Sequence, residues 1–195
     1  PSEIGVIADE SANPVHLAAD LLSQAEHDPR ARAIMVTNSE KLANLVSDEV
    51  ERQLSQLPRE SIARPAIENN SYIAVMDSVE DMFTVMNEVA PEHLEIQLPD
   101  PMEYMSMVEN AGSVFLGRYA SEPLGDYVGG TNHVLPTSGT AKFSSPLGVY
   151  DFVKRISFTQ FSRERLQEVA KDITTLARTE GLEAHARAIE VRFEK

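Results

Sequence analysis

Short apolar runs alternate with longer helical patterns through the first part of the chain, and this alternation constrains the fold more than any other feature. Five runs predict strands, at residues 4–8, 33–37, 72–76, 94–98 and 113–117. The run at 94–98 alternates apolar with polar residues, which is typical of a half-buried strand. Strands that alternate with helices predict an α/β domain with a mostly parallel sheet.

Helix signals lie between these runs. Asn13 and Pro14 supply an N-cap and a first-turn proline for a helix over about 15–26. Ser39, or Asn38 before it, caps a second helix, whose apolar positions recur at nearly helical spacing: Leu42, Val46, Val50, Leu54 and Leu57. Ser78 caps a third, to about residue 89. The stretch 58–70, with two prolines, reads as a polar connection, and a short helix follows at about 102–109.

Residues 118–145 have no periodicity and are rich in Gly, Pro, Ser and Thr. An unperiodic connection of this length is usually functional or disordered, and the aromatic and aliphatic residues within it favour an ordered, functional loop. Pro146 begins a short helical pattern to about residue 156, and two helices are expected after Ser162 and Leu182. We therefore expect an α/β domain over 1–145 and a helical C-terminal arm over 146–195 that could pack on a partner chain.

Charge and cysteine content narrow the classes of partner and metal site. The chain carries 17 Lys+Arg against 31 Asp+Glu, a formal net charge of −14, which opposes nucleic-acid binding. No apolar run approaches the ~20 residues of a membrane-spanning helix, so neither nucleic acid nor a membrane is an expected partner. There is no cysteine, so any metal would be held by His, carboxylate or amide ligands.

Two pairs of polar residues stand at element boundaries. Gln24 and His27, at positions i and i+3, project from one helix face and could share a ligand, although a helix-terminal histidine is often only a capping or solvated residue. Glu92 and His93 lie where a helix ends and a strand begins, and such a pair can transfer protons. An exposed turn is the alternative interpretation of this second pair.

Further candidates lie in the long loop and in the tail. Glu122 and Asp126 flank a Pro-Leu-Gly spacer and could point two carboxylates at a metal or a substrate ammonium group, or could simply be solvated. His133 lies in the same loop, and Glu180 and His185 bracket the break between the tail helices, where a polar-face role is the alternative. No G-x-G-x-x-G fingerprint and no P-loop follow any predicted strand.

The chain opens as Pro1-Ser2-Glu3, without an initiating Met, and runs directly into an apolar strand. A strand of this kind needs neighbours on both sides. We therefore expect this chain to be a fragment of a longer protein.

Six segments together resemble the histidinol dehydrogenase family in residues, order and spacing. They are GVIADESANP (5–14), DLLSQAEH (20–27), APEHLE (90–95), SEPLGDYVGGTNHVLP (121–136), FSSPLGV (143–149) and EGLEAH (180–185). The resemblance spans essentially the whole chain. It implies a Rossmann-like, aldehyde-dehydrogenase-like sheet flanked by helices, in the C-terminal part of a cytoplasmic homodimer. The N-terminal part, with the NAD pocket, would be missing.

The family oxidises L-histidinol through the aldehyde to L-histidine with two NAD and one zinc per site. Carried over by motif, Gln24, His27, Asp126 and His185 would bind zinc and substrate, with His185 and Glu180 reaching the partner's site. His93 would be the general base, and Glu92 would activate the water that hydrates the aldehyde. By the same resemblance, three more residues of this chain would line the substrate pocket: Ser2, Glu122 and His133.

Three hypotheses follow for the chain. The first is the catalytic portion of a zinc-dependent, NAD-linked dehydrogenase, inactive in isolation. The second is a non-catalytic acidic module that binds zinc or imidazole ligands, and the third is a zinc hydrolase that uses Glu92. One conflict remains in the first reading, because ligands of parallel sheets usually lie beyond the carboxyl ends of strands. Glu92 and His93 instead precede their strand, so either a mixed sheet or a different strand boundary is expected.

Overall fold

The computed structural model describes residues 1–194 and divides into two compact units, Pro1–Phe152 and Val153–Lys195. The first unit holds a five-stranded sheet in the order β3-β2-β1-β4-β5. Its strands are β1 (Glu3–Ala8), β2 (Arg32–Thr37), β3 (Tyr72–Val75), β4 (His93–Gln97) and β5 (Ser113–Leu116). Every neighbouring pair is parallel, so the predicted α/β fold is confirmed.

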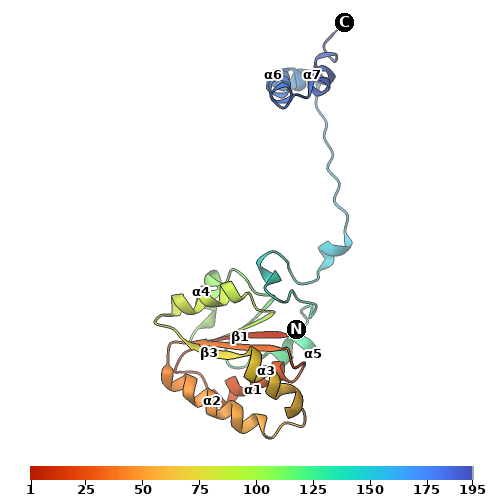
Figure 1. Cartoon of the computed structure of the whole chain (residues 1–195). Coiled ribbons are helices and arrows are strands. Elements are labelled where there is room, and N and C mark those ends of the chain that lie inside the picture. The colour runs from red at the N-terminus through yellow and green to blue at the C-terminus, as the bar shows by residue number, and fades with distance from the viewer. Residues whose placement is uncertain (195) are drawn as a thin grey trace. The chain divides into compact units, whose positions relative to one another are not determined.

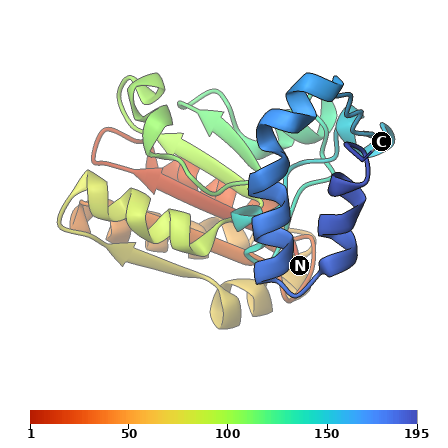
Figure 2. The ribbon, with the colours of Figure 1, turned by 90° about the horizontal axis from the view of Figure 1, so that it is seen from above.

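Helices cover both faces of this sheet (Figure 1). The helices α1 (Pro14–Ala25), α2 (Glu40–Leu54) and α3 (Glu60–Asn70) pack on one face, and α4 (Val79–Val89) packs on the other. Figure 2 shows α4 lying over the strands. Alternate residues of β1 serve the two cores, since Ile4 and Val6 face α1 and Ile7 faces α4. Burial on both faces explains why β1 and β2 read as continuous apolar runs.

Side-chain caps begin three of these helices, as the sequence predicted. Asn13 accepts a hydrogen bond from the Val15 amide at the start of α1, where Pro14 occupies the first turn. Ser39 and Ser78 accept from first-turn amides of α2 and α4. Each cap satisfies an N–H that has no partner within its helix.

Two local predictions are wrong. Residues 58–70 contain α3, which buries Ala63 and Ala66 although Pro65 lies inside it. The helical pattern predicted over 146–156 contains only a short 3-10 turn, Val149–Phe152. Tertiary packing of two small residues against α1 therefore overrides the weak helix propensity of a proline-containing segment.

Strand β4 differs from the half-buried strand that the sequence predicted, because all five of its residues are buried. Leu94 and Ile96 belong to the core beneath α4. His93, Glu95 and Gln97 alternate with them and therefore share the opposite face. That polar face is covered instead of solvated, so it must satisfy its polar groups internally.

The second unit contains α6 (Arg163–Thr179) and α7 (Glu183–Glu190), which lie side by side (Figure 2). Gly181 links them with a positive φ of 75°, a conformation that favours glycine. Arg178 of α6 forms ion pairs with Glu183 and Glu190. Among the described residues, no helix combines the length and the hydropathy needed to cross a bilayer.

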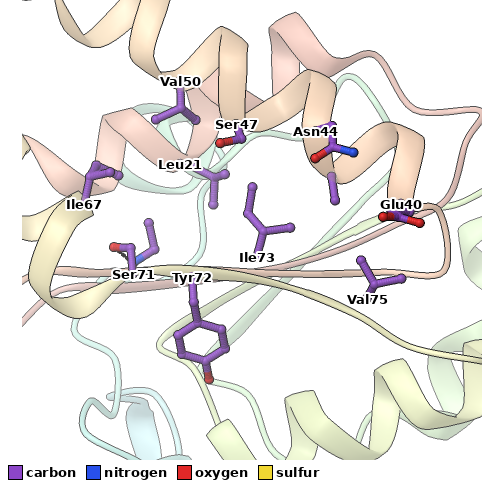
Figure 3. Close-up of a pocket in the computed structure, with 12 residues that line it drawn as sticks. Leu21, Glu40, Asn44, Ser47, Val50, Ile67, Ser71, Tyr72, Ile73 and Val75 are labelled. Carbon is purple, nitrogen blue, oxygen red and sulfur yellow. Dashed lines mark hydrogen bonds between the residues drawn. The ribbon is translucent and has the colours of Figure 1, made fainter.

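A cavity of ≈ 480 Å³ lies at the outer edge of the sheet, beside β3 (Figure 3). It is lined by α1, α2, α3 and β3, with Leu21, Val50, Ile67 and Ile73 among its apolar residues. None of the predicted site residues lines it.

Gly112, just before β5, passes unusually close to the chain at Glu92. Its N–H donates to the Pro91 carbonyl at 3.0 Å, and the next amide, of Ser113, donates to the Glu92 carbonyl at 2.8 Å. A Cβ at position 112 would lie 2.4 Å from that Glu92 carbonyl oxygen. Since the obstructing atom belongs to the backbone, only glycine fits without moving the strand.

We expect Gly112→Ala to lower the free energy of unfolding by about 1–3 kcal/mol, the usual cost of forcing extra atoms into a packed site. Urea unfolding followed by circular dichroism measures the change. Gly148→Ala is the matched control, because a Cβ there meets nothing closer than 3.9 Å. Equal stability of the two variants would contradict the close approach.

Candidate active site at the amino edge of the sheet

The register between β1 and β4 sets Ile4 opposite His93, which brings Glu3 next to Glu92 and His93. The N–H of Glu3 donates to Glu92 Oε2 at 3.0 Å. The carbonyl of Glu3 lies 3.0 Å from Nδ1 of His93. One residue of β1 therefore holds both predicted proton-transfer residues through its main chain.

The Glu3 carbonyl determines the tautomer of His93. A carbonyl oxygen can only accept, so Nδ1 must carry the hydrogen and the lone pair is on Nε2. Nε2 lies 3.7 Å from Oε1 of Glu122. Burial lowers the pKa of His93, which keeps the ring neutral at pH 7. His93 is thus a neutral imidazole with Nε2 able to accept a proton.

Glu92 lies on the other side of the Glu3 peptide and is also buried. Burial raises the pKa of Glu92 to about 7, although the Glu3 N–H bond opposes this shift. Its Oε2 lies 3.7 Å from Nδ1 of His93. A carboxyl group with a pKa near neutrality can accept or donate a proton under physiological conditions.

A metal-capable group of side chains adjoins this pair. The ligand atoms of His27, Glu122 and Asp126 all lie within 4.8 Å of one another. His27 follows α1, while Glu122 and Asp126 lie four residues apart on the short helix α5 (Glu122–Tyr127). Burial and the charge of Asp126 raise the pKa of Glu122, so a cation would relieve both carboxylates.

Three buried polar atoms in this region lack hydrogen-bond partners among the described residues. Both amide atoms of Gln24, which is 1% exposed, and Oε1 of Glu122 have no hydrogen-bond partner in the described part of the chain. An unpaired buried polar group costs about 1–3 kcal/mol. Gln24, near the end of α1, lies one helical turn before His27, so its orphaned amide oxygen could join His and carboxylate ligands around a metal.

The remaining predicted site residues lie in different places. Ser2 immediately precedes β1 and is half-buried, and its carbonyl accepts from the Arg32 amide. His133 is exposed in the loop after α5. Glu180 and His185 belong to the second unit, where both are exposed, Glu180 at the end of α6 and His185 in α7. The first unit thus brings together Glu92, His93, Gln24, His27, Glu122 and Asp126.

Glu92 and His93 were expected to conflict with a parallel sheet, because they lie at the start of their strand. Neither of the two expected explanations is sufficient. All pairs are parallel, which excludes a mixed sheet. Strand β4 begins at His93, one residue before its predicted start, so the boundary shifts slightly but Glu92 still precedes the strand. Glu3, Glu92 and His93 lie at the amino edge of the sheet. The beginnings of β1 and β4 supply these residues, and α5, which follows β5 in the chain, supplies the carboxylates beside them.

Three further residues of this region escaped the sequence interpretation. Glu3 pairs with Arg32 at 3.2 Å and accepts from the Ser138 amide at 3.1 Å. Glu95, on the polar face of β4, is hydrogen-bonded to Asp20 of α1, and burial raises the pKa of both. The spacing of Glu95, two residues after His93, is a signal that could have indicated it.

Comparison with known proteins places these residues in a family context. A family model described as histidinol dehydrogenase matches residues 1–193. The chain is 66% identical over 194 residues to the histidinol dehydrogenase of Lactiplantibacillus plantarum and 64% identical over 195 residues to that of Streptococcus mutans. These alignments cover 100% of this chain and 45% and 46% of the relatives.

A crystal structure of histidinol dehydrogenase from Elizabethkingia anophelis is similar to the whole chain. The TM-score is 0.91 at 42% sequence identity, over 100% of this chain and 45% of that one. The chain therefore spans a little less than half the length of the proteins that it matches.

The raised pKa of Glu92 predicts a pH-dependent stability. The unfolded chain ionises Glu92 near its ordinary pKa of 4.5, whereas the folded chain retains the proton to about pH 7. Folding stability from this group therefore falls as the pH rises from about 5 to about 7. Glu92→Gln keeps an acceptor for the Glu3 N–H but removes the ionisation.

We expect the stability of Glu92→Gln, relative to the parent chain, to increase by about 1–3 kcal/mol between about pH 5 and about pH 8, since one pKa unit is about 1.4 kcal/mol. Urea unfolding at the two pH values measures it. Glu103→Gln, at an exposed position, is the control and should show no such change. A parallel pH profile for all three proteins would refute the burial effect.

Proposed function

Because the chain belongs to the histidinol dehydrogenase family, we propose that it forms the C-terminal catalytic portion of such an enzyme. The complete enzyme would oxidise L-histidinol through L-histidinal to L-histidine with two NAD. The portion described here would contribute the proton-transfer residues and most of the zinc ligands. Alone, it would not turn over histidinol.

One carboxylate carries this proposal. Glu122 has an oxygen 3.7 Å from Nε2 of His93, and its carboxylate also belongs to the ligand group formed with His27 and Asp126. The imidazole that can accept a proton thus adjoins the side chains that can hold a cation. Such convergence of a base, a metal-capable group and orphaned polar atoms is typical of an active site.

His93 and Glu92 divide the proton transfers. His93, neutral and with Nε2 free, removes the alcohol proton of histidinol as hydride leaves the adjacent carbon. Glu92, with a pKa of about 7, takes a proton from the water that hydrates the aldehyde before the second oxidation. The Glu3 peptide keeps both side chains in place throughout, because its N–H and carbonyl contact one each.

The residues present fit zinc. Gln24, His27 and Asp126 would hold the ion, and His185 would complete the set; all four are nitrogen or oxygen ligands. The orphaned atoms of Gln24 and the closely spaced carboxylates of α5 support this assignment. When bound, zinc would orient the imidazole and amino nitrogens of the substrate.

The remaining site residues complete the substrate pocket. Glu122 would meet the substrate ammonium group, and Ser2 and His133 would line the pocket. Glu180 and His185 would serve the site of the partner subunit in a homodimer, which suits a two-helix unit with exposed polar residues at its turn. NAD would accept the hydride, and its pocket would lie mostly in the N-terminal part of the complete enzyme.

Zinc binding by the 195-residue chain tests the metal assignment. Titration against a chromogenic chelator should give one site, and His27→Ala should weaken zinc binding by at least about 100-fold, since loss of even an outer-shell partner costs about 10- to 100-fold. His16→Ala, at an exposed histidine within α1, should bind zinc as the parent does. Equal zinc affinity of the two variants would reject this site.

Two activity measurements test the division of roles. The chain alone, supplied with zinc, histidinol and NAD, should produce no NADH, and turnover at the rate of a complete enzyme would exclude the incomplete-enzyme proposal. In the complete enzyme, Glu92→Gln should lower histidine formation by about 10²- to 10⁴-fold, the usual contribution of general acid–base catalysis. The first oxidation should be partly retained, so aldehyde should accumulate; equal loss of both oxidations would contradict the role of Glu92.

A further inference from the structure

Glu95 is completely buried in the middle of β4, on the face that His93 and Gln97 share. We propose that Glu95 is a positioning residue: through direct hydrogen bonds it holds α1 and α5 on β4 and so sets the spacing between His27, which follows α1, and the carboxylates of α5. This inference rests on the proposed function, and the experiment below separates the two.

The contact with α5 is made through the main chain. The Glu122 amide donates to Glu95 Oε1 at 2.9 Å. Ser121, which precedes α5, makes no capping hydrogen bond with its own side chain. Glu95, 27 residues away in sequence, therefore satisfies an amide at the start of this helix that local chemistry leaves open. Glu122 and Asp126 are carried by the helix that begins at this bond.

The contact with α1 is made through a carboxyl pair. The side chains of Glu95 and Asp20 are hydrogen-bonded to each other. Asp20 lies one turn before Gln24 on α1, so this bond holds the helix beside its metal-capable end. Gln97 Nε2 donates to the second oxygen of Glu95 at 3.0 Å and fixes the carboxyl plane.

Packing shows why position 125 also matters to this arrangement. A Cβ on Gly125 would lie 2.8 Å from the ring of Phe115 on β5, so α5 sits directly on the sheet beside Glu95. The helix is thus held in its middle by the contact between Gly125 and Phe115, and at its start by the hydrogen bond to Glu95. A displacement of α5 would move both Glu122 and Asp126 relative to His27.

A purely structural role would be served as well by an apolar residue, because buried carboxyl groups are seldom worth more to stability than well-packed hydrocarbon. A positioning role makes a different prediction. Among the described residues, the hydrogen bonds of the Glu95 side chain go to Gln97, to the Glu122 amide and to Asp20, and not to a metal-capable atom. They reach α5, which carries Glu122 and Asp126, and α1, which leads into His27. Its substitution should therefore change metal affinity in a chain that is still folded.

The experiment measures zinc affinity of the 195-residue chain by chelator competition and hydrogen exchange of the Glu122 amide by NMR. Glu95→Leu should weaken zinc binding about 10- to 100-fold, the range for outer-shell partners, and speed exchange at Glu122. Glu95→Gln retains an acceptor for the Glu122 amide and should restore zinc affinity to within about threefold. Ile96→Val, on the opposite face of β4, controls for general destabilisation and should leave both readouts unchanged.

Asp20→Ala provides a second variant if Glu95→Leu does not fold. It removes only the contact with α1, so zinc affinity should fall while the Glu122 amide stays protected. Zinc affinity of Glu95→Leu or Asp20→Ala equal to that of Ile96→Val would overturn the inference, while loss of binding in His27→Ala would keep the proposed metal site. If the parent chain and His27→Ala bind zinc equally, the metal site fails and the inference fails with it.

Discussion

Parallel pairing of β1 with β4 is the constraint on which the candidate site depends. With Ile4 opposite His93, the main chain of Glu3 meets Glu92 with its N–H and His93 with its carbonyl. The Glu92 carboxylate therefore accepts a hydrogen bond from the Glu3 main chain, whereas Nδ1 of His93 donates one to it. A one-residue change of register would remove both bonds and turn the alternate face of the strand toward α1.

The polar face of β4 explains how so many acidic groups share one region. Burial raises the pKa of Asp20, Glu92, Glu95 and Glu122. Protons, backbone amides and one glutamine satisfy part of this cluster, while Gln24 and one oxygen of Glu122 remain without a partner in the described chain. A cation bound beside His27, Glu122 and Asp126, as we propose, would supply what those groups lack.

Much of the fold could be predicted because its signals are local. The apolar runs of β1 and β2 and the caps Asn13, Ser39 and Ser78 identify strands and helix starts within a few residues. Helix α3 gave no such signal, since the only residues that it buries fully are two alanines. Strand β4 was assigned correctly but its environment was not, because an alternating pattern is the same whether the polar face meets water or buried carboxyls.

The site was less predictable, because its signals are local while its assembly is not. Gln24 with His27, Glu92 with His93, and Glu122 with Asp126 were selected as local pairs, but their meeting point depends on strand order, which no local pattern contains. The amino-edge location likewise follows only from the crossover that brings β4 beside β1. Sequence motifs indicate residues whose own chemistry is recognisable. Glu95 and Asp20 were missed because they hold other residues in position.

The main-chain character of the Glu3 contacts has a consequence for how this protein can vary. Since the peptide of Glu3 holds Glu92 and His93, the identity of the side chain at position 3 can drift without loosening either group, provided that the ties to Arg32 and Ser138 are replaced. The site should not tolerate the insertion or deletion of a residue in β1, because either change would shift the register with β4. Selection should therefore act more strongly on the length of β1 than on the residue type at position 3.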